Sequence, residues 1–248
     1  MTLAAALADT FEVDLVVARP VGELRGNESP NVRVVDLNAS RVAAAVPALV
    51  RYLRHERPAG LISVLTHTNV AAILAARVAD TAVRVVVTEH LPPQRRNVRE
   101  RIGTRLTGLL YATADVVAVS TGVRRDFSQA AGIPESRIHV IYNPVDMASL
   151  SRQASEPTAE LTAAGVPMLL SVGRLTDQKD HVTLVRAFAL VRSQRRCTLM
   201  ILGEGESRAG IEAEARRLGV ADDLTLPGFV PNPYPHFRRA AAFVLSSR

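Results

Sequence analysis

The residues best suited to chemistry lie in one short loop, Gly173-Arg174-Leu-Thr-Asp-Gln-Lys179, which directly follows an apolar run at 168–172. Lys179 is the only lysine among thirty lysine and arginine residues. Because arginine is used at the other twenty-nine positions, a lysine here indicates a candidate functional residue. A mobile ammonium and a planar guanidinium both bind phosphate oxygens, and Gly173 lets the backbone approach a ligand closely. The pattern favours a diphosphate site over a merely polar loop that precedes a helix.

A second candidate loop, Gly203-Glu-Gly205, follows the apolar run 198–202. A G-x-G turn after a strand is part of the dinucleotide-binding fingerprint, but Arg208 occupies the third glycine position. This argues against an NAD site. A turn that touches part of a nucleotide and a purely structural turn both remain open.

Two histidines follow strand-like runs: His67 comes after 61–65, and His90 comes after 83–87. A histidine at the carboxyl end of a strand can hydrogen-bond a substrate hydroxyl or a leaving group near neutral pH. We expect a functional role for His90. For His67, function and a structural hydrogen bond are equally open.

Composition narrows the class of protein. The chain has 248 residues, a formal net charge of +6 and one cysteine, Cys197. A single cysteine excludes an internal disulfide and a cysteine-ligated metal site, which favours a reducing, cytoplasmic compartment. No apolar run approaches the ~18 residues that cross a bilayer. The positive charge permits nucleotides, anionic lipid or nucleic acid as partners without choosing among them.

The segment from Arg95 to Arg105 predicts a basic amphipathic helix, with apolar residues at Val98, Ile102, Leu106 and Leu109. Such a helix can lie on anionic lipid, as a peripheral membrane contact. A solvated charged face over the core is the more common arrangement, and we favour it on sequence alone. Nucleic acid is not expected, because no aromatic residues interleave with the arginines.

The elements that position these residues alternate between strand-like and helix-compatible runs. The strand-like runs show little polar alternation, as expected for strands covered on both faces, and they fall at 13–17, 32–35, 61–65, 83–87, 116–119, 138–142, 168–172, 198–202, 224–226 and 243–246. This predicts an α/β protein with two Rossmann-like, doubly wound parallel sheets. We expect a first domain over 1–146, a linker over 147–164 and a second domain over 165–248.

Both predicted domains look incomplete. The first seventeen residues begin with a helical period and only then reach a strand, and residues 240–247 look like a strand with no element after it. We therefore expect a chain truncated at both ends.

These motifs together resemble the retaining GT-B glycosyltransferases of family 4. The second domain matches most specifically, through 171–179, 199–206, 226–230 and 243–248. The first domain matches more loosely, through 66–67, 86–90, 118–120 and 142–146. The resemblance implies the GT-B fold and transfer of a sugar from a nucleotide diphosphate donor, UDP being the most frequent in the family, with retention of the anomeric configuration.

The resemblance also implies roles for particular residues. Arg174 and Lys179 would bind the donor diphosphate and stabilise the departing charge without a metal or other cofactor. His90 would face the transferred sugar. The remaining donor-binding positions would be Gly173, Gly203, Gly205, Phe229 and Val230, and the sugar or acceptor side would include His67 and Asn143. The acceptor would be a sugar or a lipid-linked sugar.

Two departures from the family pattern affect the expected activity. The glycine-rich loop that follows the family's first strand is missing, and the paired glutamates that contact the donor would come just after Arg248. We expect this chain to be weakly active or inactive by itself. A nucleotide-sugar epimerase on the same scaffold and a non-catalytic nucleotide-binding module are the alternatives.

Overall fold

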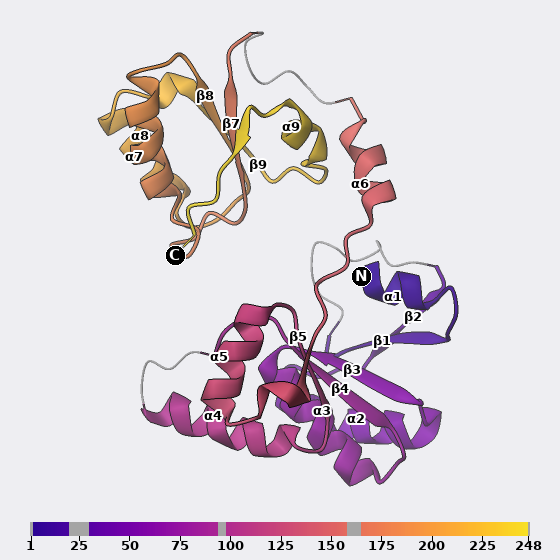
Figure 1. Ribbon diagram of the computed structural model, residues 1–248. Helices are drawn as coiled ribbons and strands as arrows, with labels where there is room; N and C mark the ends of the chain where they lie inside the picture. The colour runs from indigo at the N-terminus through magenta and orange to yellow at the C-terminus, as the bar shows by residue number, and fades with distance from the viewer. Residues whose placement is uncertain (1, 20–29, 94–97, 158–164, 248) are drawn as a thin grey trace. The chain divides into compact units, whose positions relative to one another are not determined.

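The computed structural model describes residues 2–19, 30–93, 98–157 and 165–247 (Figure 1). The chain divides into two compact units, Met1–Pro144 (unit 1) and Val145–Arg248 (unit 2). Each unit combines parallel strands with covering helices, so the α/β class expected from the alternation is confirmed.

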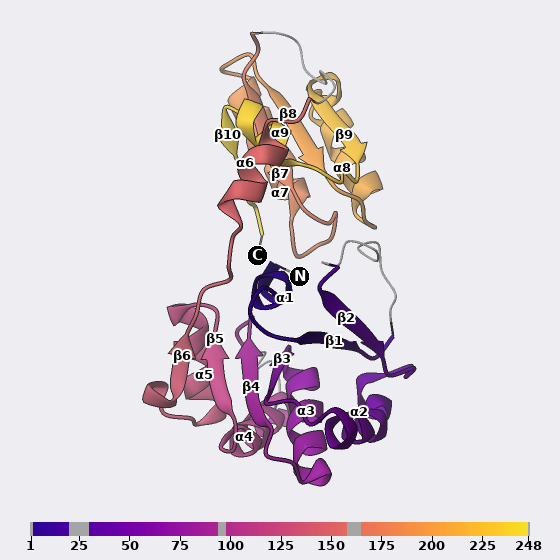
Figure 2. The ribbon, with the colours of Figure 1, turned by 90° about the vertical axis from the view of Figure 1, so that its right-hand side faces the viewer.

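Unit 1 alternates strands and helices in the order that the apolar runs predict. Strands β3 to β6 form one parallel sheet in sequential order, seen side by side in Figure 2, while β1 and β2 pair in parallel with each other. The elements are α1 (Thr2–Leu7), β1 (Val13–Val17), β2 (Val32–Asp36), α2 (Val42–Glu56), β3 (Gly60–Val64), α3 (Thr66–Ala79), β4 (Arg84–Glu89), α4 (Val98–Tyr111), β5 (Asp115–Ala118), α5 (Thr121–Ala131) and β6 (Ile138–Val140).

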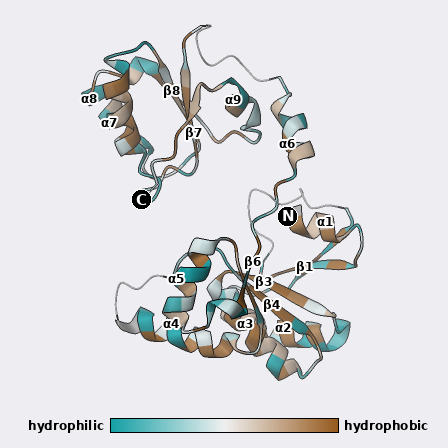
Figure 3. Ribbon diagram, in the orientation of Figure 1, coloured by the Kyte–Doolittle hydropathy of each residue, from teal (hydrophilic) through white to brown (hydrophobic). Residues whose placement is uncertain are grey.

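The core of unit 1 lies between its central strands and helices α2, α3 and α5. Val87 and Ala118 of the sheet pack in one cluster with Leu53, Ile73 and Phe127 from the helices. Figure 3 shows the hydrophobic character of β3 and β4. The expectation that every strand is covered on both faces is wrong for β3, where Ile62 and Val64 are 47% and 46% exposed. Among the described strands β3 pairs only with β4, so it lies at an edge of its sheet.

Unit 2 holds a four-stranded parallel sheet in the order β10-β7-β8-β9. Its elements are α6 (Met147–Ala154), β7 (Met168–Val172), α7 (His181–Arg192), β8 (Thr198–Leu202), α8 (Arg208–Arg217), β9 (Leu224–Gly228), α9 (Tyr234–Arg239) and β10 (Ala242–Phe243).

Alternate residues of β8 supply two separate cores, which explains why its sequence is apolar throughout. Leu199 and Ile201 pack with Phe188 of α7 and Ile211 of α8. Met200 and Leu202 face the other side of the sheet and belong to a second cluster. Successive side chains of a strand face opposite sides of the sheet, so a strand covered on both sides must be apolar at every position.

Two expected boundaries differ in unit 2. The predicted linker 147–164 begins with helix α6, because the Asp146 carboxylate caps it by accepting from the Ser149 amide at 2.9 Å. The Asn232 side chain donates to the Gln153 carbonyl at 2.9 Å and attaches this helix to unit 2. Residues 158–164 lie outside the described part. The last strand, expected over 243–246, is only Ala242–Phe243.

Candidate functional site

The loops that follow β7, β8 and β9 are joined to one another by backbone hydrogen bonds. The Gly173 amide donates to the Leu202 carbonyl at 2.9 Å, and the Gly203 amide donates to the Gly228 carbonyl at 2.8 Å. The Leu175 amide donates to the Glu204 carbonyl at 2.9 Å. The carboxyl edge of the sheet is therefore one connected backbone surface, the position at which open α/β sheets bind ligands.

Gly203 and Gly205 are required by the close approach of these loops. Gly203 has φ +142° and Gly205 has φ +157°. A Cβ on Gly203 would overlap the Gly173 carbonyl oxygen and lie 2.9 Å from its carbon, and one on Gly205 would lie 2.8 Å from the Leu175 carbonyl carbon. The structural explanation that the sequence left open is sufficient for both glycines. Their contact with a donor stays a prediction.

Lys179 lies beside the end of β7, with its side chain against Gly173. A Cβ on Gly173 would meet three carbons of the lysine stem at 3.6–3.8 Å. The Lys179 amide donates to the Thr176 carbonyl at 3.0 Å, and its carbonyl accepts from the Ser246 hydroxyl at 2.8 Å. The backbone of Lys179 is thereby fixed on both sides.

Arg174 is exposed on the same loop. Within the described ranges, neither Arg174 nor Lys179 has a carboxylate in ion-pair distance. By contrast, Arg208 pairs with Glu204 and Glu212, each at 3.0 Å, and so holds its own helix in place. Arg174 and Lys179 therefore keep their charge available for an anion.

Helix α7 begins two residues after Lys179, at His181. Asp180 is its N-cap and accepts from the Thr183 amide at 3.3 Å. His181 opens the helix but is only 3% exposed, and its Nδ1 has no hydrogen-bond partner. Burial, together with the nearby charge of Lys179, lowers the pKa of His181. The imidazole is therefore a neutral core group at the base of the loop.

The segment after β9 places one predicted donor residue in solvent and one against the core. Phe229 is 57% exposed, whereas Val230 packs against the cluster that contains Met200. An exposed aromatic ring beside a backbone-lined edge offers a stacking surface for a planar base. This is consistent with the expected nucleoside position, which stays a prediction.

In unit 1, His90 lies directly after β4, as the sequence predicts. The Thr88 hydroxyl donates to the Ser63 carbonyl at 3.0 Å, and the same oxygen lies 3.2 Å from His90 Nε2. Because the hydroxyl has one proton and gives it to Ser63, His90 Nε2 must be the donor to Thr88. Nδ1 is then the ring nitrogen left to bind a hydroxyl.

Sequence reasoning missed the buried carboxylate next to this histidine. Glu89 is 3% exposed and accepts from the Tyr111 hydroxyl at 2.5 Å, from the Asn69 amide at 3.2 Å and from the Thr66 hydroxyl at 3.0 Å. Burial, followed by the charge of Glu89, raises the pKa of Tyr111. The signal in the sequence was an acidic residue at the end of an apolar strand. Acidic residues are rarely buried without partners, so a carboxylate at such a position indicates a hydrogen-bonded buried group.

The other two candidates of unit 1 are solvent-exposed. His67 follows β3, as expected, and lies in the first turn of α3, which starts at Thr66. The turn before it is tight, since Leu65 adopts φ 77°. Asn143 follows β6 in an irregular segment. That these residues and His90 meet a donor held by unit 2 stays a prediction.

The described residues contain no group of three or more His, Cys, Asp or Glu side chains that could hold a metal ion. None of the helices in the described ranges is both long and apolar enough to cross a bilayer.

Both halves of the chain match glycosyltransferase family models. Residues 1–149 match Glycosyltransferase Family 4, and residues 153–248 match Glycosyl transferases group 1. The N-acetylgalactosamine-N,N'-diacetylbacillosaminyl-diphospho-undecaprenol 4-alpha-N-acetylgalactosaminyltransferase of Campylobacter jejuni is 29% identical over 74% of this chain and 50% of its own length. The 2-deoxystreptamine glucosyltransferase of Streptomyces kanamyceticus is 29% identical over 80% of this chain and 56% of its own.

This chain thus spans about half the length of these relatives. Among solved structures, Anabaena HepE in complex with UDP and glucose superimposes with a TM-score of 0.76 at 17% identity, over 99% of this chain and 69% of the other. The galactosyltransferase WaaB of the lipopolysaccharide outer core gives 0.67 at 19% identity, over 99% and 70%. These structures share the two-domain GT-B fold, and by its two family matches the chain belongs to glycosyltransferase family 4.

Proposed function

We propose that unit 2 binds a UDP-sugar and that the protein transfers this sugar to a hydroxyl of a sugar or lipid-linked acceptor. The observation that carries the proposal is the pair Arg174 and Lys179, two cations without carboxylate partners in the described ranges at the carboxyl edge of a parallel sheet. Support for UDP comes from the HepE complex, and support for a lipid-linked acceptor comes from the Campylobacter relative.

The two cations act on the charge that develops during transfer. The bond between the anomeric carbon and the diphosphate oxygen breaks, and a bond to the acceptor oxygen forms. Negative charge grows on the departing UDP, where the Arg174 guanidinium and the Lys179 ammonium stabilise it, and the acceptor hydroxyl transfers its proton to the departing diphosphate oxygen. Positive side chains can do this work without a metal ion. Retention of the anomeric configuration is the family's stereochemistry and is proposed on that ground.

His90 is proposed to bind the transferred sugar through Nδ1. With the Nε2 proton donated to Thr88, Nδ1 accepts a hydrogen bond from a sugar hydroxyl. This contact orients the sugar while the anomeric bond breaks.

A cytoplasmic location is proposed from the cysteine content alone.

Calorimetry with UDP tests the phosphate role directly. Lys179→Ala and Arg174→Ala are each expected to weaken binding at least about ten-fold, since a hydrogen bond to a charged group contributes about 1.5–3 kcal/mol. Arg195→Ala is the matched control, because Arg195 is exposed and lies before β8, at the opposite edge of the same sheet. Equal affinity in the wild type and the Lys179 variant would reject the proposed diphosphate site.

The alternatives are separated by the products. Incubating the intact parent protein with UDP-sugar alone and with candidate acceptors distinguishes transfer from epimerisation. An epimerised nucleotide sugar formed without acceptor would favour an epimerase. UDP binding without any product in the intact parent would favour a non-catalytic binding module.

A further inference from the structure

Helix α4 of unit 1 turns an apolar stripe toward solvent. Ile102, Leu106 and Leu109 are 56%, 57% and 72% exposed. The helical repeat of about 100° per residue places the three within about 60° of one another. The sequence favoured a helix that covers the core and presents a charged face to solvent. That prediction is wrong for these three apolar residues, which are exposed.

The packed face of α4 explains this orientation. Tyr111 is fully buried and Thr107 is 9% exposed, and both lie on the side that meets the core. Gly108 lets the helix approach α5 closely, since a Cβ there would lie 3.0 Å from the Ala131 carbonyl carbon. With Thr107, Gly108 and Tyr111 turned inward, Ile102, Leu106 and Leu109 are left outside.

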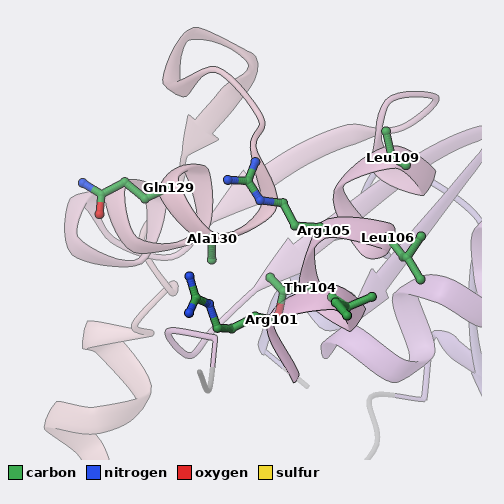
Figure 4. Close-up of a pocket in the computed structure, with 8 residues that line it drawn as sticks. Arg101, Thr104, Arg105, Leu106, Leu109, Gln129 and Ala130 are labelled. Carbon is green, nitrogen blue, oxygen red and sulfur yellow. The ribbon is translucent and has the colours of Figure 1, made fainter. Parts of the chain in front are cut away.

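Two arginines flank the stripe beside a cavity of about 490 Å³ between α4 and α5. Figure 4 shows the guanidinium groups of Arg101 and Arg105 on the side of α4 toward Gln129 and Ala130, while Leu106 points away from them. In the part of the chain that the structure describes, neither arginine has a carboxylate in ion-pair distance. None of the residues that line this cavity belongs to the candidate site.

We propose that α4 docks on the surface of an anionic phospholipid bilayer. The three residues Ile102, Leu106 and Leu109, here called the apolar stripe, insert among the acyl chains. Arg101 and Arg105 bind lipid phosphates at the flank of the helix, where their long stems let the charged heads reach the interface. A helix that lies in the membrane plane with an apolar face and basic flanks has the pattern of interfacial binding.

Charge complementarity favours an anionic bilayer over the other occupants. The segment 95–105 carries five arginines and one glutamate, although 95–97 lie outside the described residues. A symmetric contact between two copies through this face would bring arginines of like charge together, which is unfavourable. A small soluble anion would neutralise the arginines but leave the apolar stripe in water.

Vesicle binding by the 248-residue chain tests the proposal, and it is independent of the glycosyltransferase activity. The chain is mixed with vesicles of phosphatidylcholine, with or without about one third phosphatidylglycerol, and the bound fraction is measured by sedimentation. Binding is expected only with the anionic lipid and is expected to weaken with salt. Arg101→Gln with Arg105→Gln should reduce partitioning roughly twenty-five-fold, from about five-fold for each arginine.

Leu106→Ser with Leu109→Ser should reduce partitioning by about ten-fold or more at unchanged charge. The matched controls are Leu190→Ser on α7, where Leu190 is 70% exposed, and Arg51→Gln on α2. Neither control is expected to change binding. All substituted side chains are exposed, and circular dichroism confirms that each variant folds.

Four results would overturn the proposal. The first is equal binding to neutral and anionic vesicles. The second is binding that the stripe and arginine variants leave unchanged. The third is loss of vesicle binding on addition of millimolar inorganic diphosphate at constant ionic strength, which would indicate a soluble-anion site. A dimer that light scattering detects and Leu109→Ser dissociates would assign the stripe to a second copy instead.

Discussion

The requirement for glycine at position 203 predicts a large, local loss of stability in Gly203→Ala. An alanine there must adopt φ +142°, a strained conformation that costs about 1–3 kcal/mol. Its Cβ would also overlap the Gly173 carbonyl oxygen, which belongs to the backbone and cannot rotate away. Separating the loops weakens the hydrogen bonds from Gly173 to Leu202 and from Gly203 to Gly228, each contributing about 1 kcal/mol. The expected total is about 3–5 kcal/mol.

Gly173→Ala is the matched control on the facing loop. No positive φ is found at Gly173, and the nearest atoms to an added Cβ are the flexible carbons of Lys179, at 3.6 Å or more. This variant is expected to change stability by less than about 1 kcal/mol.

Amide hydrogen exchange of β7 and β8 measures this effect in unit 2 alone, which matters because a two-unit chain need not unfold in one transition. Exchange of the most protected amides should become at least about 100-fold faster in Gly203→Ala, which corresponds to about 3 kcal/mol. Equal protection in the two variants would refute the argument that loop contact requires glycine.

Three other perturbations test the buried polar groups. Glu89→Leu should destabilise unit 1 by about 3 kcal/mol or more, because two buried donors lose their acceptor, while Glu89→Gln keeps an acceptor and should cost less; urea unfolding compares them. Burial lowers the pKa of His181 and of His236, so each favours the neutral form when folded. The stability of unit 2 should be constant above about pH 6.5 and fall as pH drops through the folded pKa values, and His181→Leu should reduce that slope in pH-dependent unfolding. Hydrogen bonds from two arginines lower the pKa of Glu214 to about 2, so its contribution is complete above about pH 4.3 and is lost as pH falls toward 2; Glu214→Gln should remove this acid-sensitive step. A pH profile that this variant leaves unchanged would count against the ion pair.

Local patterns in the sequence were sufficient to predict the fold class and most elements. The continuous apolar runs indicated buried parallel strands, and the two cores on either side of β8 show why that inference holds. Lys179, Arg174 and His90 could be singled out because each follows such a run. In a parallel sheet the carboxyl ends of the strands lie at the same edge, where ligands bind. Chain order and residue type alone carry that information.

Long-range contacts decided what the sequence left open. Position 203 requires glycine because the Gly173 carbonyl, thirty residues away in the chain, lies against it. Glu89 gained its significance from donors contributed by α3 and α4, which no local pattern brings together. The same holds for the proton position on His90, which depends on the Ser63 carbonyl of another strand.

Helix α4 separates the two kinds of information most clearly. The sequence determined that it is amphipathic and basic, because periodicity is a property of neighbouring residues. It could not determine which face meets the core, because that depends on the surface presented by α5. The tertiary structure turned Gly108 and Tyr111 inward and Leu109 outward, and so made an exposed surface of a stripe that composition alone would place inside.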